Sequence, residues 1–112
     1  MVHKEFTKIG DKLVARVTFS LPDSIWADAI YLVGDFNQWN RTSHPLQRDR
    51  QGGWRITIDL EPGRVYQFRY LRDGQEWLND SQSDAYVANP YGSDNSVVVT
   101  DPDFRPYHDG RG

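Results

Sequence analysis

The sequence predicts an all-β fold, an immunoglobulin-like sandwich of about seven short antiparallel strands. Three observations support this prediction: apolar residues recur at every second position in most segments, no segment shows the helical period, and turn-forming residues separate the short apolar runs. The chain has no cysteine, so it lacks the disulfide of antibody domains. A small β-barrel is the alternative that the same pattern leaves open.

Alternation defines the strands in the first half of the chain. Residues 13–21 alternate cleanly, so one face of this strand is expected to be buried. Its inward-facing residues are Leu13, Ala15, Val17, Phe19 and Leu21. Pro22 and Asp23 close the strand, and the apolar run 29–34 predicts a second, more fully buried strand. A short third strand is expected around Leu46.

Four further strands are expected in the second half, at residues 53–60, 65–72, 76–79 and 96–100. Asp73-Gly74 is a strong hairpin signal between two of them. The polar stretch 80–95 is predicted to be a loop. The chain 1–112 is expected to form a single module with its core at about residues 12–100, and the tail 101–112 is predicted to be extended.

The composition argues against several kinds of partner and location. Sixteen Asp and Glu against 13 Lys and Arg give a formal net charge of -3, which disfavours nucleic acid and anionic membrane surfaces. No apolar run approaches the ~20 residues needed to span a bilayer. The N-terminal segment 1–12 lacks the apolar region of a signal peptide, and with no cysteine present a cytoplasmic location is expected.

Catalytic and metal sites find little support in the sequence. None of the three histidines lies at a recognisable motif spacing: His3, His44 and His108. Asp80, Gln82 and Asp84 alternate, but the glycine and glutamate of a calcium loop do not follow. A small glycosidase would need two carboxylates across a cleft, which a sandwich of this size seldom offers. We therefore expect no catalytic residue, no cofactor and no metal.

The four tryptophans fall into two groups. Trp54 lies on the apolar face of an alternating strand and is predicted to be a core residue. Trp26 is expected to join the core or to cover one end of the sandwich. Trp39 lies in a polar turn and Trp77 follows the Asp-Gly signal, while Tyr91 lies in a polar loop. These last three suggest flat apolar platforms among polar groups.

This mixture of aromatic and polar residues suits a sugar. A sugar ring presents an apolar C–H face, which an aromatic ring can cover, and a fringe of hydroxyls, which need hydrogen-bond partners. Asn37, Arg69 and Asn95 could supply such partners. In the turn 34–40, Phe36 is predicted to anchor on the core while Trp39 faces outward as a platform.

Three motifs in order resemble a known family. They are YLVGDFNQWN at 31–40, LEPGRVYQFRYLRDGQEW at 60–77 and NPYGSDNSVV at 89–98. Together they resemble the glycogen- and starch-binding carbohydrate-binding module family 48, over about residues 29–100. The resemblance implies an early-set immunoglobulin-like sandwich and non-catalytic binding of α-1,4-linked glucans.

The resemblance also implies roles for single residues. By motif position, Trp39 and Trp77 would stack on glucose rings. Arg69 matches the family's basic residue that bonds sugar hydroxyls, and Asn95 matches an asparagine that bonds a neighbouring glucose. Ser93 keeps the hydroxyl of a family threonine.

Tyr91 stands where the family has a leucine that inserts into the glucan helix. The implied partner is an α-glucan polysaccharide or oligosaccharide, with a glucan-active enzyme as a further candidate, and a monomer is expected. Two other functions remain open at this point. One is a spacer or protein-interaction module that accompanies a glucan-processing enzyme or kinase complex without binding sugar, and the other is the small glycosidase.

Overall fold

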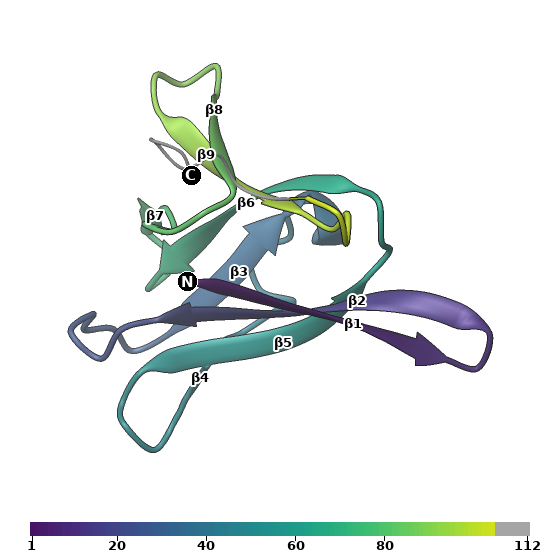
Figure 1. Ribbon diagram of the computed structural model, residues 1–112. Helices are drawn as coiled ribbons and strands as arrows, with labels where there is room; N and C mark the ends of the chain where they lie inside the picture. The colour runs from purple at the N-terminus through teal and green to yellow at the C-terminus, as the bar shows by residue number, and fades with distance from the viewer. Residues whose placement is uncertain (105–112) are drawn as a thin grey trace, which may run out of the picture.

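The computed structural model describes residues 1–104, which form two antiparallel β-sheets packed face to face (Figure 1). Within this range there is no α-helix, and the single helical turn is the 3-10 helix η1, Asp35–Asn37. No helix among these residues is long and apolar enough to cross a membrane. The predicted all-β sandwich is confirmed.

The first sheet has the strand order β1-β2-β5-β4 and is the lower layer in Figure 1. Its strands are β1 (Val2–Ile9), β2 (Lys12–Leu21), β5 (Trp54–Leu60) and β4 (Gln47–Arg48). The long β1–β2 and β2–β5 ladders form most of this layer. The strand β4 pairs with β5 over only two residues.

The second sheet has the order β3-β6-β9-β8, with β7 paired to β6 beyond the end of β9. Its strands are β3 (Ile30–Gly34), β6 (Val65–Arg72), β9 (Asp94–Val99), β8 (Ala85–Ala88) and β7 (Glu76–Leu78). The β8–β9 hairpin projects from this upper layer in Figure 1. The short strand β7 therefore leaves room between itself and the hairpin on the same edge of β6.

Of the nine strands in residues 1–104, seven lie at the predicted positions and two, β1 and β8, were missed by the sequence analysis. In β1, the side chain of Lys4 stands at a partly buried position, where its amine lies 2.8 Å from a carboxylate oxygen of Asp84. Because a lysine occupies this inward position of β1, the sequence of the strand does not show the alternation of apolar and polar residues. All four residues of β8 are exposed, so that strand carries no alternation, and the predicted loop 80–95 contains it. Because β1 belongs to the first sheet, the fold begins before the predicted core boundary at residue 12.

The core lies between the sheets and follows the predicted inward faces. The ring centroids of Phe19 and Phe68 are 5.0 Å apart, and those of Phe68 and Tyr70 are 5.7 Å apart, both edge to face. Such aromatic pairs stabilise a core beyond the area they bury. The buried cluster comprises Ala15, Val17, Phe19, Leu21, Ile30, Leu32, Leu46, Trp54, Leu60, Phe68, Tyr70 and Val98.

The opposite, outward face of the second sheet also has buried residues. Val33 is 0% and Leu71 is 2% exposed, although neither belongs to the core cluster. Val33 pairs with Arg69, and Leu71 pairs with Trp77. Side chains at opposed positions of an antiparallel pair lie on the same face of the sheet. Thus Arg69 and Trp77 share the outward face with two apolar residues that are shielded from solvent.

The Asp73-Gly74 turn forms the predicted hairpin between β6 and β7. Both residues have positive φ, 53° and 70°, as the favoured hairpin turns with two left-handed residues require. One carboxylate oxygen of Asp73 also accepts hydrogen bonds from the backbone N–H groups of Asp28 and Ala29, at 2.8 and 3.0 Å. The turn that positions β7 is thereby fastened to the start of β3.

The prediction for Trp54 is confirmed, whereas that for Trp26 is wrong. Trp54 is 4% exposed, and its indole N–H donates to the carbonyl oxygen of Ile25 at 3.1 Å. Trp26 is 77% exposed. Its neighbours Ile25 and Ala27 pack against the core, whereas the side chain of Trp26 faces solvent.

The predicted extended tail begins with a turn, because the N–H of Phe104 donates to the carbonyl oxygen of Asp101 at 3.0 Å. The rest of that tail, residues 105–112 with His108, lies outside the described residues.

A buried polar network joins β6, β9 and the segment after β7. The hydroxyl of Tyr70 donates to a carboxylate oxygen of Asp80 at 2.7 Å, and both side chains are fully buried. The other oxygen of Asp80 accepts the N–H of Gln82 at 2.8 Å, while the N–H of Asp80 donates to the hydroxyl of Ser96 at 3.0 Å. Buried polar groups that are fully paired fix one arrangement of the surrounding chain.

This network predicts how stability depends on alkaline pH. Burial, followed by the charge and hydrogen bond of Asp80, raises the pKa of Tyr70 well above its usual value. The neutral phenol is favoured in the folded state, so its stabilising contribution is complete below about pH 10 and is lost as the pH rises from there toward the folded-state pKa. We expect the free energy of unfolding in urea to fall above about pH 10. Tyr70→Phe should flatten that fall and cost about 1–3 kcal/mol at neutral pH. An unchanged pH slope in the variant would contradict the assignment.

Candidate functional site

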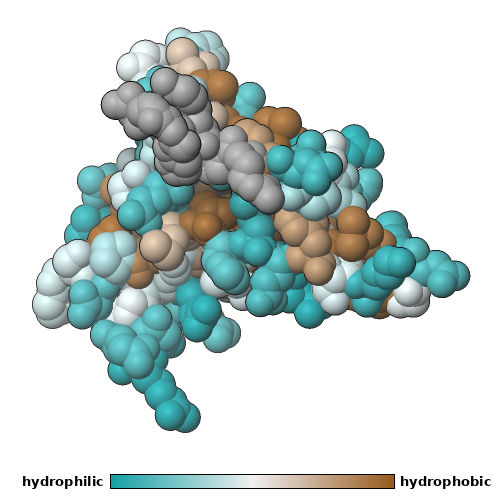
Figure 2. Space-filling model, viewed as in Figure 1, coloured by the Kyte–Doolittle hydropathy of each residue, from teal (hydrophilic) through white to brown (hydrophobic). Residues whose placement is uncertain are grey.

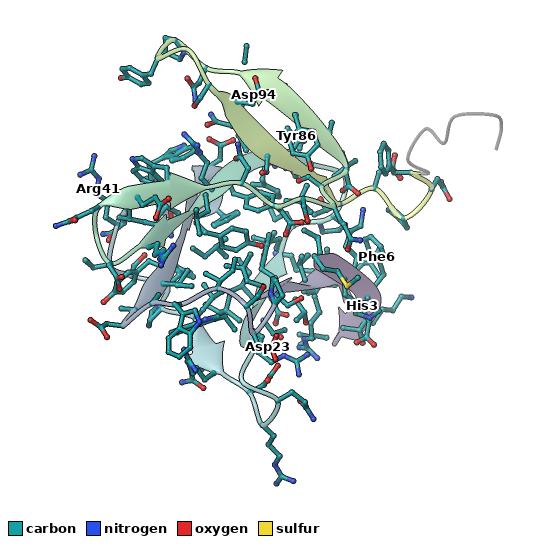
Figure 3. The ribbon with its side chains drawn as sticks, turned by 90° about the vertical axis from the view of Figure 1, so that its left-hand side faces the viewer. His3, Phe6, Asp23, Arg41, Tyr86 and Asp94 are labelled. Carbon is teal, nitrogen blue, oxygen red and sulfur yellow. The ribbon has the colours of Figure 1, made fainter. Side chains whose placement is uncertain are left out.

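An open groove of about 600 Å³ lies over the outward face of the second sheet. Its lining residues come from the turn after β3, from β6, from β7 and from the β8–β9 hairpin. They are Trp39, Arg41, Arg69, Trp77, Asn89, Pro90, Tyr91 and Asn95. Four segments that are distant in sequence therefore meet at one surface. Figure 3 places Arg41 on the opposite side of the molecule from His3 and Phe6 of β1.

Trp39 is held at the groove by an unusual turn. Gln38 and Trp39 have φ of 53° and 57°, a left-handed conformation that costs a non-glycine residue about 1–2 kcal/mol. The N–H of Trp39 donates to the carbonyl oxygen of Gly34 at 2.9 Å, and its indole N–H donates to a carboxylate oxygen of Asp35, also at 2.9 Å. Strained backbone of this kind persists only where the surroundings determine it.

Asp35 joins this turn to the sheet. Its second carboxylate oxygen accepts the backbone N–H of Gln67 in β6 at 2.7 Å. A Cβ added at Gly34 would lie 2.5 Å from the carbonyl oxygen of Gln67, so the absence of a side chain lets the turn lie this close to β6. The ring centroids of Phe36 and Phe19 are 5.8 Å apart. This contact supports the prediction that Phe36 anchors the turn on the core.

Asn37 does not belong to the groove, and its predicted role as a sugar ligand is corrected. The side chain is only 7% exposed. Its oxygen accepts the N–H of Gly34 at 3.0 Å, and its NH₂ group lies 3.0 Å from the carbonyl oxygen of Leu32 and 3.1 Å from a ring nitrogen of His44. The amide thus hydrogen-bonds inside the turn and is shielded from solvent, so it does not present these groups to a ligand in the groove.

Two guanidinium groups lie near the indole ring of Trp77. The central carbon of the Arg41 guanidinium is 5.5 Å from the centre of the indole, and that of Arg69 is 5.9 Å away. Distances of this size allow attraction between a cation and the face of the ring. β7 fixes the backbone of Trp77 opposite Leu71, so the two side chains are neighbours on the outward face, and Leu71 is buried there.

Arg69 connects the strand to the hairpin loop. One of its terminal nitrogens donates to the hydroxyl of Ser93 at 3.1 Å. Its Nε atom is buried and has no hydrogen-bond partner. A buried donor without a partner is uncommon and costly. The unpaired Nε lies beneath the surface, while the guanidinium of Arg69 lines the groove.

Asn89 organises the loop 89–95. Its side-chain nitrogen donates to the hydroxyl of Ser93 and to the side-chain oxygen of Asn95, at 3.1 and 3.2 Å, and its oxygen accepts the N–H of Tyr91 at 2.9 Å. The nitrogen of Asn95 in turn donates to the side-chain oxygen of Gln67 at 3.0 Å. Tyr91 projects from this loop and is 92% exposed.

The structure brings together five of the seven predicted site residues, which line the groove: Trp39, Arg69, Trp77, Tyr91 and Asn95. Ser93 does not line it but contacts Arg69, and Asn37 lies inside the turn. The sequence analysis missed three lining residues, Arg41, Asn89 and Pro90. Asn89 and Pro90 could have been predicted, because they directly precede Tyr91 in the sequence. Arg41 could not, because no neighbouring sequence feature indicates a place in the groove.

Within residues 1–104, no group of three or more His, Cys, Asp or Glu side chains could hold a metal ion. The eight lining residues of the groove include neither a carboxylate nor a histidine for proton transfer. The salt bridge in which Arg16 lowers the pKa of Asp59 lies on the first sheet, away from the groove. The groove can therefore supply stacking surfaces and hydrogen bonds.

Comparison of the sequence with models of known protein families gives one match that covers most of the chain. The sequence model of carbohydrate-binding module 48, described as the isoamylase N-terminal domain, matches residues 16–102. The chain belongs to carbohydrate-binding module 48. The early-set sandwich that the resemblance implied is thus the fold of its family, and the groove-lining residues from Trp39 to Asn95 all lie inside the matched range.

Individual relatives of this module are branching enzymes. The chain is 31% identical to the 1,4-alpha-glucan branching enzyme of Deinococcus radiodurans over 72% of its own length and 12% of that enzyme. It is 69% identical to the 1,4-alpha-glucan-branching enzyme of Dictyostelium discoideum over 32 residues, 29% of this chain and 5% of that enzyme. It is 28% identical to the chloroplastic/amyloplastic enzyme of Oryza sativa over 68% of this chain and 10% of that protein. The module therefore spans between 5% and 12% of the length of these relatives.

The double role of Asp35 predicts a specific defect when it is removed. Asp35→Ala deletes the acceptors of both the Trp39 indole N–H and the Gln67 backbone N–H. We expect the indole N–H signal of Trp39 in NMR spectra to broaden and to exchange faster with solvent, and the free energy of unfolding to fall by about 1 kcal/mol. Asp23→Ala is the matched control, because Asp23 is exposed and its carboxylate makes no hydrogen bond among the described residues. An unaltered Trp39 signal in Asp35→Ala would show that the turn does not depend on this carboxylate.

Proposed function

We propose that this module binds α-1,4-linked glucans such as glycogen, starch, maltooligosaccharides and cyclodextrins without catalysing a reaction. The observation that carries the proposal is the meeting of two tryptophans from separate segments, Trp39 and Trp77, with hydrogen-bonding side chains in one open groove. Membership of a carbohydrate-binding family supports it. The names of the branching-enzyme relatives point to α-glucan as the substrate class.

Stacking supplies the affinity in this account. The axial C–H groups of glucose cover the indole faces of Trp39 and Trp77, which removes apolar surface from water. Both rings are held before a ligand arrives, Trp39 by Asp35 and Trp77 by its place in β7. Pre-ordered side chains lose little conformational entropy on binding.

Hydrogen bonds supply the specificity. Arg69 and Asn95 both line the groove, and the only hydrogen bond of the Arg69 guanidinium among the described residues is to Ser93. These groups bond the glucose hydroxyls, which would otherwise lose water without compensation. Ser93 positions Arg69 through its hydroxyl, and Tyr91 adds an exposed ring where the family has an inserting leucine. Together with two or three stacked rings, this predicts a dissociation constant of roughly 1 μM to 1 mM.

A second candidate function is contact with another protein, such as a glucan-active enzyme. Trp26 favours it, because this ring is 77% exposed and lies outside the groove. Figure 2 shows apolar residues on one face of the molecule in separate areas among hydrophilic ones. An isolated exposed tryptophan is a weaker signal than a continuous apolar patch. The monomeric state and the cytoplasmic location stay predictions.

Sugar titration tests the proposed function. Maltoheptaose or β-cyclodextrin should shift the backbone amide signals around Trp39, Arg69 and Trp77, and the shifts should saturate by about 10 mM sugar. Trp77→Ala should weaken binding by about tenfold, since one stacked ring is lost. Trp39→Ala should have an effect of similar size.

Trp26→Ala provides the matched control, because it removes an exposed tryptophan outside the groove. It should bind within about twofold of the parent chain. If saturating sugar leaves the groove signals unmoved, the proposal fails. Capture of a partner protein that is lost in Trp26→Ala and not displaced by glucan would then favour the interaction module.

A further inference from the structure

We propose that the groove prefers α-glucan chains that carry a phosphate monoester, and that Arg41 and Arg69 hold the phosphate. This inference rests on the proposed function and names a ligand class within it. It starts from the charge of the groove. The chain as a whole is acidic, with 16 Asp and Glu against 13 Lys and Arg. The eight lining residues nevertheless include two arginines and no carboxylate.

The two guanidinium groups lack acidic partners. Within residues 1–104, neither Arg41 nor Arg69 takes part in an ion pair, whereas Arg16, Arg64 and Arg72 each pair with a nearby carboxylate. Arg69 has in addition a buried Nε without a hydrogen-bond partner. Two uncompensated positive charges therefore face one groove in an acidic protein.

The carboxylate that is bonded to a groove residue, that of Asp35, is already occupied by other partners. Asp35 contacts the lining residue Trp39, but one of its oxygens accepts the indole N–H and the other accepts the N–H of Gln67. Figure 3 shows Arg41 well apart from the labelled carboxylates of Asp23 and Asp94. An anion on the ligand would thus meet little competition from the protein's own acidic groups.

The position of both arginines beside Trp77 connects the charge to the sugar. Their guanidinium carbons lie 5.5 and 5.9 Å from the centre of the indole. A glucose ring stacked on that indole places its hydroxyl edge next to these groups. A phosphate ester on such a hydroxyl would present oxygens that match the planar, two-pronged donors of arginine. A neutral hydroxyl at the same place accepts hydrogen bonds through two lone pairs but has no negative charge to pair with the two guanidinium groups.

The test compares three ligands with the full chain at about 50 mM salt, where screening is weak. They are neutral maltoheptaose, maltoheptaose bearing one phosphate monoester, and inorganic phosphate. We expect the ester to bind about fivefold or more tightly than the neutral sugar, and the ratio to fall toward one at about 500 mM salt. Arg41→Gln should lower this ratio toward one. Arg50→Gln, which removes an exposed arginine outside the groove, should leave it unchanged.

Equal affinities for the ester and the neutral sugar would overturn the inference while leaving the proposed function intact. The inference would also be overturned if Arg41→Gln kept the preference for the ester over the neutral sugar, or if Arg50→Gln lost it to the same extent. In either case the preference would not arise from this groove. Inorganic phosphate binding as tightly as the ester would show a general anion site rather than phosphoglucan recognition. If neither sugar binds, the proposed function itself fails.

Discussion

The groove depends on the turn that follows β3 and contains the 3-10 helix η1. The buried side-chain amide of Asn37 holds this turn in place. That amide satisfies the backbone at Leu32 and Gly34, which lets the chain reverse in a tight space beside β6. The strain of two left-handed residues is then offset by Asp35, which binds both the indole of Trp39 and the backbone of β6. A half-buried aromatic ring at the groove is thereby held by polar groups.

The second platform relies on the sheet. Trp77 and Arg69 stand on the outward face next to Leu71 and Val33, which are almost completely shielded from solvent although the core lies on the other side. The sheet thus has apolar residues on both faces, one face packed against the first sheet and the other beneath the groove. Side chains supported in this way need little rearrangement to bind a ligand, which is what the proposed function requires.

The sequence predicted the sandwich because most strands keep one apolar face, and it predicted Trp39 and Trp77 because large rings in polar surroundings are conspicuous. It could not separate the buried amide of Asn37 from a surface amide, since both sit among turn residues. Arg41 was missed because its relation to Trp77 exists only after distant segments meet. The strand β1 was missed because Lys4 occupies a partly buried position through an ion pair that is formed across the fold.

The measurement that tests the central claim most directly is an NMR search for contacts between the bound sugar and the indoles. With maltoheptaose at saturation, intermolecular nuclear Overhauser effects should connect the axial C–H protons of glucose to the ring protons of Trp39 and Trp77. Such effects at Trp26, with none at the two groove tryptophans, would contradict the account, because the sugar would then use a surface that the groove does not include.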